Sequence, residues 1–94
     1  MTLSSRVPTP SAPTLALYSR AWCHLCEEMR AALVPLAAEL GANVEVIDVD
    51  AEPALVARYD ELVPVLVLDG IELSRYRLDV ERVRAALAAR RMGA

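Results

Sequence analysis

Two hydrophobic patterns of different period meet at Cys23. The run TLALYS, residues 14–19, is short and apolar and is bounded by a proline-rich segment and by Arg20, which is typical of a buried strand. From Cys23 onward, apolar side chains recur every three or four residues, which predicts a long amphipathic helix. These side chains are Leu25, Met29, Leu33, Leu36 and Leu40. The fold therefore begins with a strand that leads directly into a helix.

The predicted helix contains a proline and ends at a glycine. Pro35 lacks a backbone donor and crowds the carbonyl of Ala31, so we expect a kink near it. The apolar pattern continues beyond Pro35, which favours one kinked helix over two separate ones. Gly41 suits the left-handed conformation that commonly ends a helix.

The rest of the chain predicts three more strands and two more helices. Residues 44–49, VEVIDV, are apolar on both alternating phases, so we expect a central strand covered on both faces. The fixed φ of Pro53 suits the first position of a helix, so we expect a short helix to begin there. Asp69-Gly70 separates two apolar runs within residues 63–76, which is a strong signal for a hairpin with a type I′ turn. In the last predicted helix, Asp79 is the cap and the inward stripe is Val80, Val83 and Leu87.

The predicted element order is β-α-β-α-β-β-α. This order indicates an α/β fold with a mixed four-stranded sheet and helices on both faces. We expect a disordered Ser/Pro-rich arm over residues 1–13, one domain over residues 14–91 and a tail over residues 92–94. The chain has no phenylalanine, so its core must rest on leucine and valine, with Ile47, Ile71 and a few aromatic rings.

Charge and hydropathy exclude several functional classes. A net charge of -3 and an isoelectric point near 5.0 argue against binding to nucleic acid, which requires a basic face. No run approaches the roughly 18 apolar residues of a membrane span, and the first residues lack the apolar core of a secretory signal. We therefore expect a cytoplasmic protein that contacts neither nucleic acid nor membrane. We also expect it to be a monomer. Thiols are kept reduced in the cytoplasm, so a close cysteine pair there is catalytic or metal-binding rather than a permanent crosslink.

Both cysteines of the chain lie at the start of the first predicted helix. Cys23 follows the strand, and Cys26 lies one helical turn further on. Unpaired backbone N–H groups and the helix dipole stabilise an anion at this position, so a thiol ionises there more readily than free cysteine. The spacing brings the two sulfurs within disulfide reach, so Cys26 can resolve a mixed disulfide formed at Cys23.

The stretch LALYSRAWCHLC, followed by a helix and then by LVP before a hairpin, resembles the glutaredoxin branch of the thioredoxin-like superfamily, most of all its small bacterial members. The resemblance covers about residues 14–91 and implies an α/β fold of the thioredoxin-like or glutaredoxin-like type. It implies a thiol–disulfide oxidoreductase with Cys23 as nucleophile and Cys26 as resolving cysteine. It also implies that Pro64 is a cis-proline facing the pair, and that Leu62 and Val63 offer backbone groups to an extended peptide substrate.

Three residues around the pair are candidate substrate contacts. Trp22 resembles the tryptophan that precedes the pair in thioredoxins, and we expect it to line a substrate surface rather than only cover the helix start. His24 can stabilise the thiolate when charged, or it is an exposed histidine without a role. Arg20 can attract an anionic thiol substrate, or it is a solvated loop charge.

Two features depart from the glutaredoxin pattern. Glutaredoxins have a Gly-Gly pair that helps hold glutathione where this chain has Ser74-Arg75. We therefore expect no bound cofactor, and glutathione is a doubtful ligand. Glu27 and Glu28 follow the second cysteine, where a basic residue is common, and carboxylates disfavour a nearby thiolate. The thiolate should thus be less stabilised than in typical glutaredoxins.

Three functions compete on the sequence alone. The leading one is the reduction of protein or small-thiol disulfides, with a reductase or a thiol as electron donor. The second is a metal or iron–sulfur site. The pair and His24 offer three ligands at most, however, so the sequence predicts no metal site within a single chain. The third is a redox-inactive thioredoxin-like module that binds a peptide beside Pro64.

Overall fold

The computed structural model describes residues 12–93 and has the predicted element order. Residues 1–11 of the expected arm lie outside the described residues. Helix α3 extends to Gly93, past residue 91, where we placed the end of the domain. The elements are β1 (Thr14–Ser19), α1 (His24–Leu40), β2 (Asn43–Asp48), η2 (Val49–Ala51), α2 (Pro53–Tyr59), η3 (Asp60–Leu62), β3 (Val65–Leu68), β4 (Ile71–Arg75) and α3 (Val80–Gly93), where η marks a short 3-10 helix.

The four strands form one mixed sheet in the order β2-β1-β3-β4. Strand β2 runs parallel to β1, as expected for strands joined through a helix, and β3 runs antiparallel to both β1 and β4. Asp69 and Gly70 join β3 to β4 with φ angles of 52° and 82°. These left-handed values confirm the predicted hairpin turn.

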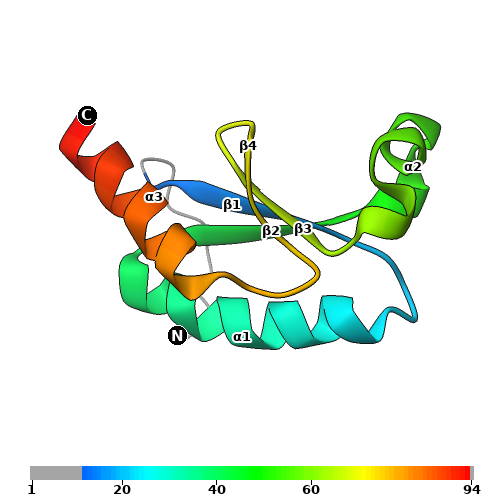
Figure 1. Ribbon diagram of the computed structural model, residues 1–94, viewed down its shortest axis with the longest axis horizontal. Helices are drawn as coiled ribbons and strands as arrows, with labels where there is room; N and C mark the ends of the chain where they lie inside the picture. The colour runs from blue at the N-terminus through cyan, green and yellow to red at the C-terminus, as the bar shows by residue number, and fades with distance from the viewer. Residues whose placement is uncertain (1–11, 94) are drawn as a thin grey trace, which may run out of the picture.

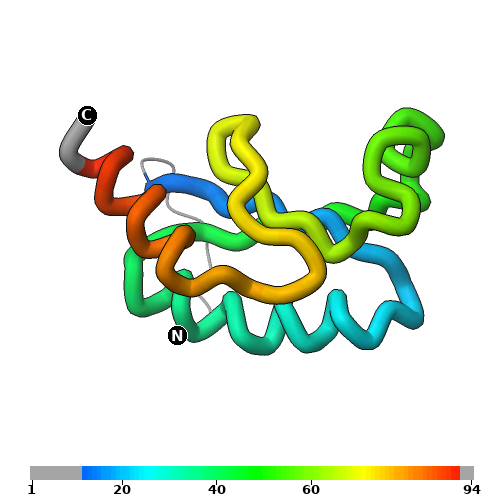
Figure 2. Tube along the Cα trace, viewed as in Figure 1, coloured from blue at the N-terminus to red at the C-terminus, as the bar shows by residue number. Residues whose placement is uncertain are grey.

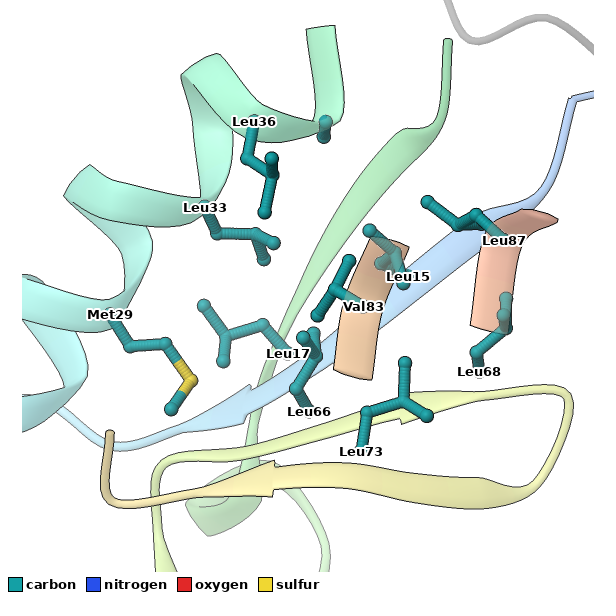
Figure 3. Close-up of a cluster of buried hydrophobic side chains, with 11 residues drawn as sticks. Leu15, Leu17, Met29, Leu33, Leu36, Leu66, Leu68, Leu73, Val83 and Leu87 are labelled. Atoms are coloured by element: carbon teal, nitrogen blue, oxygen red, sulfur yellow. The ribbon is translucent and has the colours of Figure 1, made fainter. Parts of the chain in front are cut away.

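Helices α1 and α3 cover one face of the sheet (Figure 1). Side chains from α1 point toward those of β1 and β3, and Val83 and Leu87 of α3 close the same cluster (Figure 3). The predicted aliphatic core is thus confirmed on this face. Its buried members are Leu15, Leu17, Met29, Leu33, Leu36, Ala37, Leu66, Leu68, Leu73, Val83 and Leu87.

A second, smaller cluster lies where the sheet meets α2. The tube view shows α2 and the β1–α1 loop at the same end of the molecule (Figure 2). The ring of Tyr59, the last residue of α2, stacks on Tyr18 with 4.4 Å between ring centroids. Burial of Tyr18 is the main cause of its raised pKa, and the charge of Tyr59 raises this pKa further. Cys26, Val63 and Val65 belong to the same buried cluster, so the cysteine pair is anchored in this end of the fold.

The prediction that residues 44–49 form a central strand is wrong. Strand β2 lies at the sheet edge, and Val46 is exposed. The reason is topological. The crossover through α1 places β2 on one side of β1, and the hairpin inserts β3 on the other side. Its apolar residues alternate between both faces of the sheet, because Val44 is half-buried on one face of this edge strand and Ile47 is half-buried on the other.

Three residues expected inside lie on the surface. Leu25 is exposed because the buried stripe of α1 begins one residue later, at Cys26. Val80 is the first residue of α3, and Ile71 directly follows the hairpin turn, so both lie at the ends of their elements. The leucine and valine core is therefore smaller at its margins than the sequence pattern indicates.

Local signals at the helix ends agree with the structure. Helix α1 runs without interruption through Pro35 and ends at Gly41, whose φ is 72°. The carboxylate of Asp79 accepts a hydrogen bond from the backbone N–H of Arg82, as expected of a cap.

An ion pair joins α3 to α1, since Arg84 lies 2.8 Å from Glu39. No helix within residues 12–93 is long and apolar enough to cross a membrane.

Candidate active site

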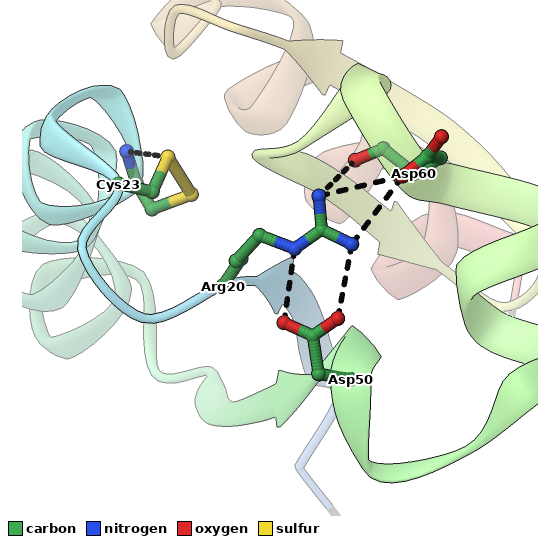
Figure 4. Close-up of a disulfide and its surroundings, with 5 residues drawn as sticks. Arg20, Cys23, Asp50 and Asp60 are labelled. Carbon is green, nitrogen blue, oxygen red and sulfur yellow. Dashed lines mark hydrogen bonds and ion pairs between the residues drawn. A yellow bond between two sulfur atoms is a disulfide. The ribbon is translucent and has the colours of Figure 1, made fainter.

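The turn from β1 into α1 places Cys23 at the helix start. Trp22 adopts a left-handed conformation with φ of 62°, which is uncommon for a bulky side chain, and turns the chain into the helix. Cys23 is the N-cap, and its sulfur accepts a hydrogen bond of 3.1 Å from the backbone N–H of Cys26 (Figure 4). The sulfur of Cys23 therefore lies at the positive end of the helix dipole, where a negative charge is stabilised.

The two cysteines form a disulfide across the first helical turn, with 5.1 Å between their Cα atoms. The structure thus represents the oxidised form. Cys23 is half-buried, whereas Cys26 is only 4% exposed. Of the two residues Cys23 is the more exposed, whereas Cys26 is a buried member of the core cluster that contains Val49 and Val63.

The Val63-Pro64 peptide bond is cis, which confirms the isomer that the family resemblance implied. Pro64 and Val63 are buried, and Leu62 is half-buried. Val63 and Leu62 pack in the same apolar cluster as Cys23 and Cys26. The carbonyl oxygen of Pro64 accepts a hydrogen bond from the backbone N–H of Tyr76 at 2.9 Å. The structure therefore brings the proline segment and the cysteine pair together.

Trp22 presents its whole side chain to solvent, with an exposed fraction of 99%. It borders an open hollow of about 270 Å³ that also reaches Cys26, Arg30 and Asp48. An aromatic ring in this setting is available to a partner but makes little contact with the protein itself.

His24 is exposed and lies in the first turn of α1. Its Nε2 atom is 2.8 Å from a carboxylate oxygen of Glu28, one helical turn further on. The structure thus pairs His24 with one of the two glutamates that the sequence places after the cysteines. A charged His24 would offset the negative charge of Glu28.

Arg20 differs from both expectations, since its guanidinium is neither free nor simply solvated. It forms two hydrogen bonds with the carboxylate of Asp50, at 2.9 and 3.0 Å, and three with Asp60. The hydrogen bond with Asp50 contributes most to a raised pKa of Arg20, and Asp60 adds to it. The sequence analysis missed both aspartates, because they lie 30 and 40 residues away and no local pattern links them to Arg20.

The residues at the glutaredoxin Gly-Gly position have other partners. Ser74 is buried, and its hydroxyl oxygen accepts a hydrogen bond from the backbone N–H of Asp79 at 2.9 Å. Arg75 pairs with Glu72 through two hydrogen bonds. Within residues 12–93, no three His, Cys, Asp or Glu side chains gather as ligands for a metal ion.

The fold and the cysteine pair define the class of protein. A mutant thioredoxin from Halobacterium salinarum superposes with a TM-score of 0.60 and 29% identity, covering 82% of this chain and 73% of its own. The chain thus has a thioredoxin-like fold, with a Cys-x-x-Cys pair at the start of its first helix.

The family is narrower than this class. The model of the Glutaredoxin-like domain (DUF836) matches residues 14–88, and the chain belongs to that family. Protein Ne2328 of Nitrosomonas europaea, solved in solution, is 35% identical with a TM-score of 0.73, covering 85% of this chain and 96% of its own. The uncharacterized protein Rv0508 of Mycobacterium tuberculosis is 36% identical over 88 residues, which are 88% of this chain and 91% of its own.

Proposed function

We propose that the protein is a thiol–disulfide oxidoreductase in which Cys23 is the nucleophile and Cys26 the resolving cysteine. The observation that carries the proposal is the unequal placement of the two sulfurs. Cys23 is the half-buried N-cap of α1, and Cys26 is buried one turn later within disulfide reach. A thiolate at a helix start is the reactive species in disulfide exchange.

The reaction has two exchange steps. The Cys23 thiolate attacks one sulfur of a substrate disulfide, that disulfide breaks, and the departing thiolate takes a proton from water. Cys26 then loses its proton and attacks the Cys23 sulfur, which releases the second substrate thiol and forms the Cys23–Cys26 disulfide. Two electrons pass from the protein to the substrate. The oxidised form is the one in the structure.

The proposed substrate is a disulfide in a protein or peptide, which would lie along the Leu62–Val63 backbone, rather than glutathione disulfide. Ser74 and Arg75 stand where glutaredoxins have the Gly-Gly pair that helps hold glutathione, and both side chains already have partners, in Asp79 and Glu72. The α2 end also carries an excess of negative charge, which disfavours an anionic ligand. Residues 19–28 and 48–64 hold seven carboxylates and two arginines, namely Glu27, Glu28, Asp48, Asp50, Glu52, Asp60 and Glu61 against Arg20 and Arg58.

Regeneration of the dithiol requires an external electron donor. A reductase or a low-molecular-weight thiol supplies two electrons by attacking the Cys23–Cys26 disulfide, and no bound cofactor takes part. The proposal places the protein in the cytoplasm, where such donors keep thiols reduced. Trp22, beside the nucleophile, is the proposed aromatic contact for the substrate.

Single-turnover reduction of a short peptide closed by one disulfide tests this function. The reduced protein should open the peptide and finish with its own cysteines joined, as measured by mass after alkylation of free thiols. Cys23→Ser should abolish the reaction because the nucleophile is gone. Cys26→Ser should accumulate a mixed disulfide between Cys23 and the peptide because the resolving thiol is gone.

The two serine variants are matched controls for each other, since each retains one thiol of the pair. Glutathione disulfide at the same concentration should react more slowly than the peptide. Unchanged peptide after incubation with the reduced wild-type protein would refute the oxidoreductase function. A mixed disulfide at Cys26 instead of Cys23 would reverse the assigned roles.

A further inference from the structure

We infer that Arg20 is a positioning residue, which holds the loop carrying Cys23 against the segment that leads to Val63 and Pro64. This inference rests on the proposed function, because it concerns how a peptide disulfide is presented to Cys23. It differs from the substrate contact that the sequence suggested for Arg20. The side chain acts through Asp50 and Asp60 and does not touch the substrate.

The contacts of Arg20 leave it little capacity for a ligand. All three guanidinium nitrogens donate hydrogen bonds, and every acceptor is an oxygen of Asp50 or Asp60 (Figure 4). Nε and Nη2 form a bidentate pair with the Asp50 carboxylate, which is the geometry that fixes an arginine most firmly. Its side chain is 29% exposed, less than either carboxylate partner.

The two aspartates lie at opposite ends of α2. Asp50 belongs to η2, just before the helix, and Asp60 is the residue that caps its end and opens η3. Nη1 also donates to the backbone carbonyl oxygen of Asp60 at 3.2 Å, so Arg20 fixes main chain as well as side chain. Leu62 and Val63 lie just beyond Asp60 in the chain. Arg20 therefore crosslinks the loop before Cys23 to the chain that leads into the cis-proline.

This crosslink matters for a substrate that contacts both sides. A peptide whose sulfur reaches Cys23 while its backbone lies along Val63 requires a fixed spacing between the two segments. Misplacement by about 1 Å can slow a reaction about 100-fold, because reacting groups must be held in line. A small disulfide that touches only Cys23 has no such requirement. Loss of Arg20 should therefore affect the two kinds of substrate differently.

The test compares a peptide disulfide with bis(2-hydroxyethyl) disulfide in wild type and Arg20→Gln. We expect the second-order rate constant of the variant to fall about tenfold with the peptide. With the small disulfide, and in alkylation of Cys23 by iodoacetamide, the rate should stay within about twofold, because the nucleophile itself is unchanged. Thermal unfolding of each variant establishes that it is folded at the assay temperature.

Asp50→Asn separates positioning from direct binding. If Arg20 positions the loop, Asp50→Asn should slow peptide reduction as Arg20→Gln does, and the double variant should be no slower than the slower single one. If Arg20 instead recruits anionic substrates, Asp50→Asn would remove one of the two carboxylates that compete for the guanidinium and speed the reduction of an acidic peptide. Such acceleration would overturn the inference.

Arg84→Gln is the matched control, since it removes another arginine–carboxylate pair far from the cysteines, with Glu39. It should leave both substrates unaffected. Equal rates for wild type and Arg20→Gln with the peptide would overturn the positioning role while leaving the oxidoreductase function intact. A wild-type protein that reduces neither disulfide would refute the proposed function, and the positioning role with it.

Discussion

Cys23 and Cys26 have different environments because α1 begins between them. The N-cap position leaves Cys23 outside the helix, with its sulfur facing the first backbone N–H groups. Cys26 lies on the inward side of the first turn and packs with Val49 and Val63. The same short segment thus supplies one partly exposed cysteine and one buried cysteine.

Glu27 should restrain the reactivity of the Cys23 thiolate in the reduced protein. It lies in the first turn of α1, and a carboxylate disfavours a nearby negative charge. We expect Glu27→Gln to raise the rate of alkylation of Cys23 by iodoacetamide at pH 7 about threefold.

Glu81→Gln is the control for this prediction, because Glu81 occupies the corresponding first turn of α3, away from the cysteines. Its alkylation rate should equal that of the wild type. A Glu27→Gln rate equal to or below that of the wild type would show that the carboxylate does not oppose the thiolate.

At the scale of single residues, predictability depends on how far apart the partners lie in the chain. The cysteine pair and the His24–Glu28 pair are three and four residues apart, so a helix brings each together by its period alone. The cis state of Pro64 followed from the family resemblance. The partners of Arg20 follow only from the packing of η2 and η3 against the β1–α1 loop, which no local pattern encodes.

At the scale of elements, the buried stripe of α1 joins the cysteine site to the main core. Leu33 has no exposed surface and packs in the main core cluster, whereas its neighbour Val34 is 50% exposed. Leu33→Ala should lower the free energy of unfolding by about 2–5 kcal/mol, since it leaves a cavity among buried side chains. Chemical denaturation monitored by circular dichroism measures this change.

Val34→Ala is the matched substitution on the exposed side of the same helix turn. It should change the free energy of unfolding by no more than about 0.5 kcal/mol, as expected for a surface site. If the two variants were equally stable, α1 would not pack on the sheet through the stripe that contains Leu33.

Periodicity predicted which elements form but not where each one lies in the sheet. The strand at residues 43–48 has β-branched residues on both phases, which suits a central position as well as an edge. Its edge position follows from the hairpin, which places β3 beside β1. Similarly, Pro35 lies within a helix that continues because packing of Leu33 and Leu36 on the sheet outweighs one lost hydrogen bond.

At the scale of the whole molecule, the main hydrophobic cluster and the cysteine pair lie in different parts of the fold. Helices α1 and α3 bury the main cluster on one face, and the Arg84–Glu39 pair joins these helices. The hydrogen bond from Arg84 lowers the pKa of Glu39, so this pair stabilises the fold above the ordinary pKa of glutamate and loses its effect in acid. The α2 end carries the cysteines, the cis-proline and Arg20 with its two aspartates.

A redox titration of the cysteine pair decides whether this end works as an exchanging dithiol. The protein is equilibrated in buffers of reduced and oxidised glutathione, starting from either form, and its free thiols are counted by mass after alkylation. We predict one two-electron transition with the same midpoint from both directions, between about -200 and -270 mV, the range of glutaredoxins and thioredoxin. A pair that stays oxidised throughout, or that never re-forms its disulfide, would contradict the account.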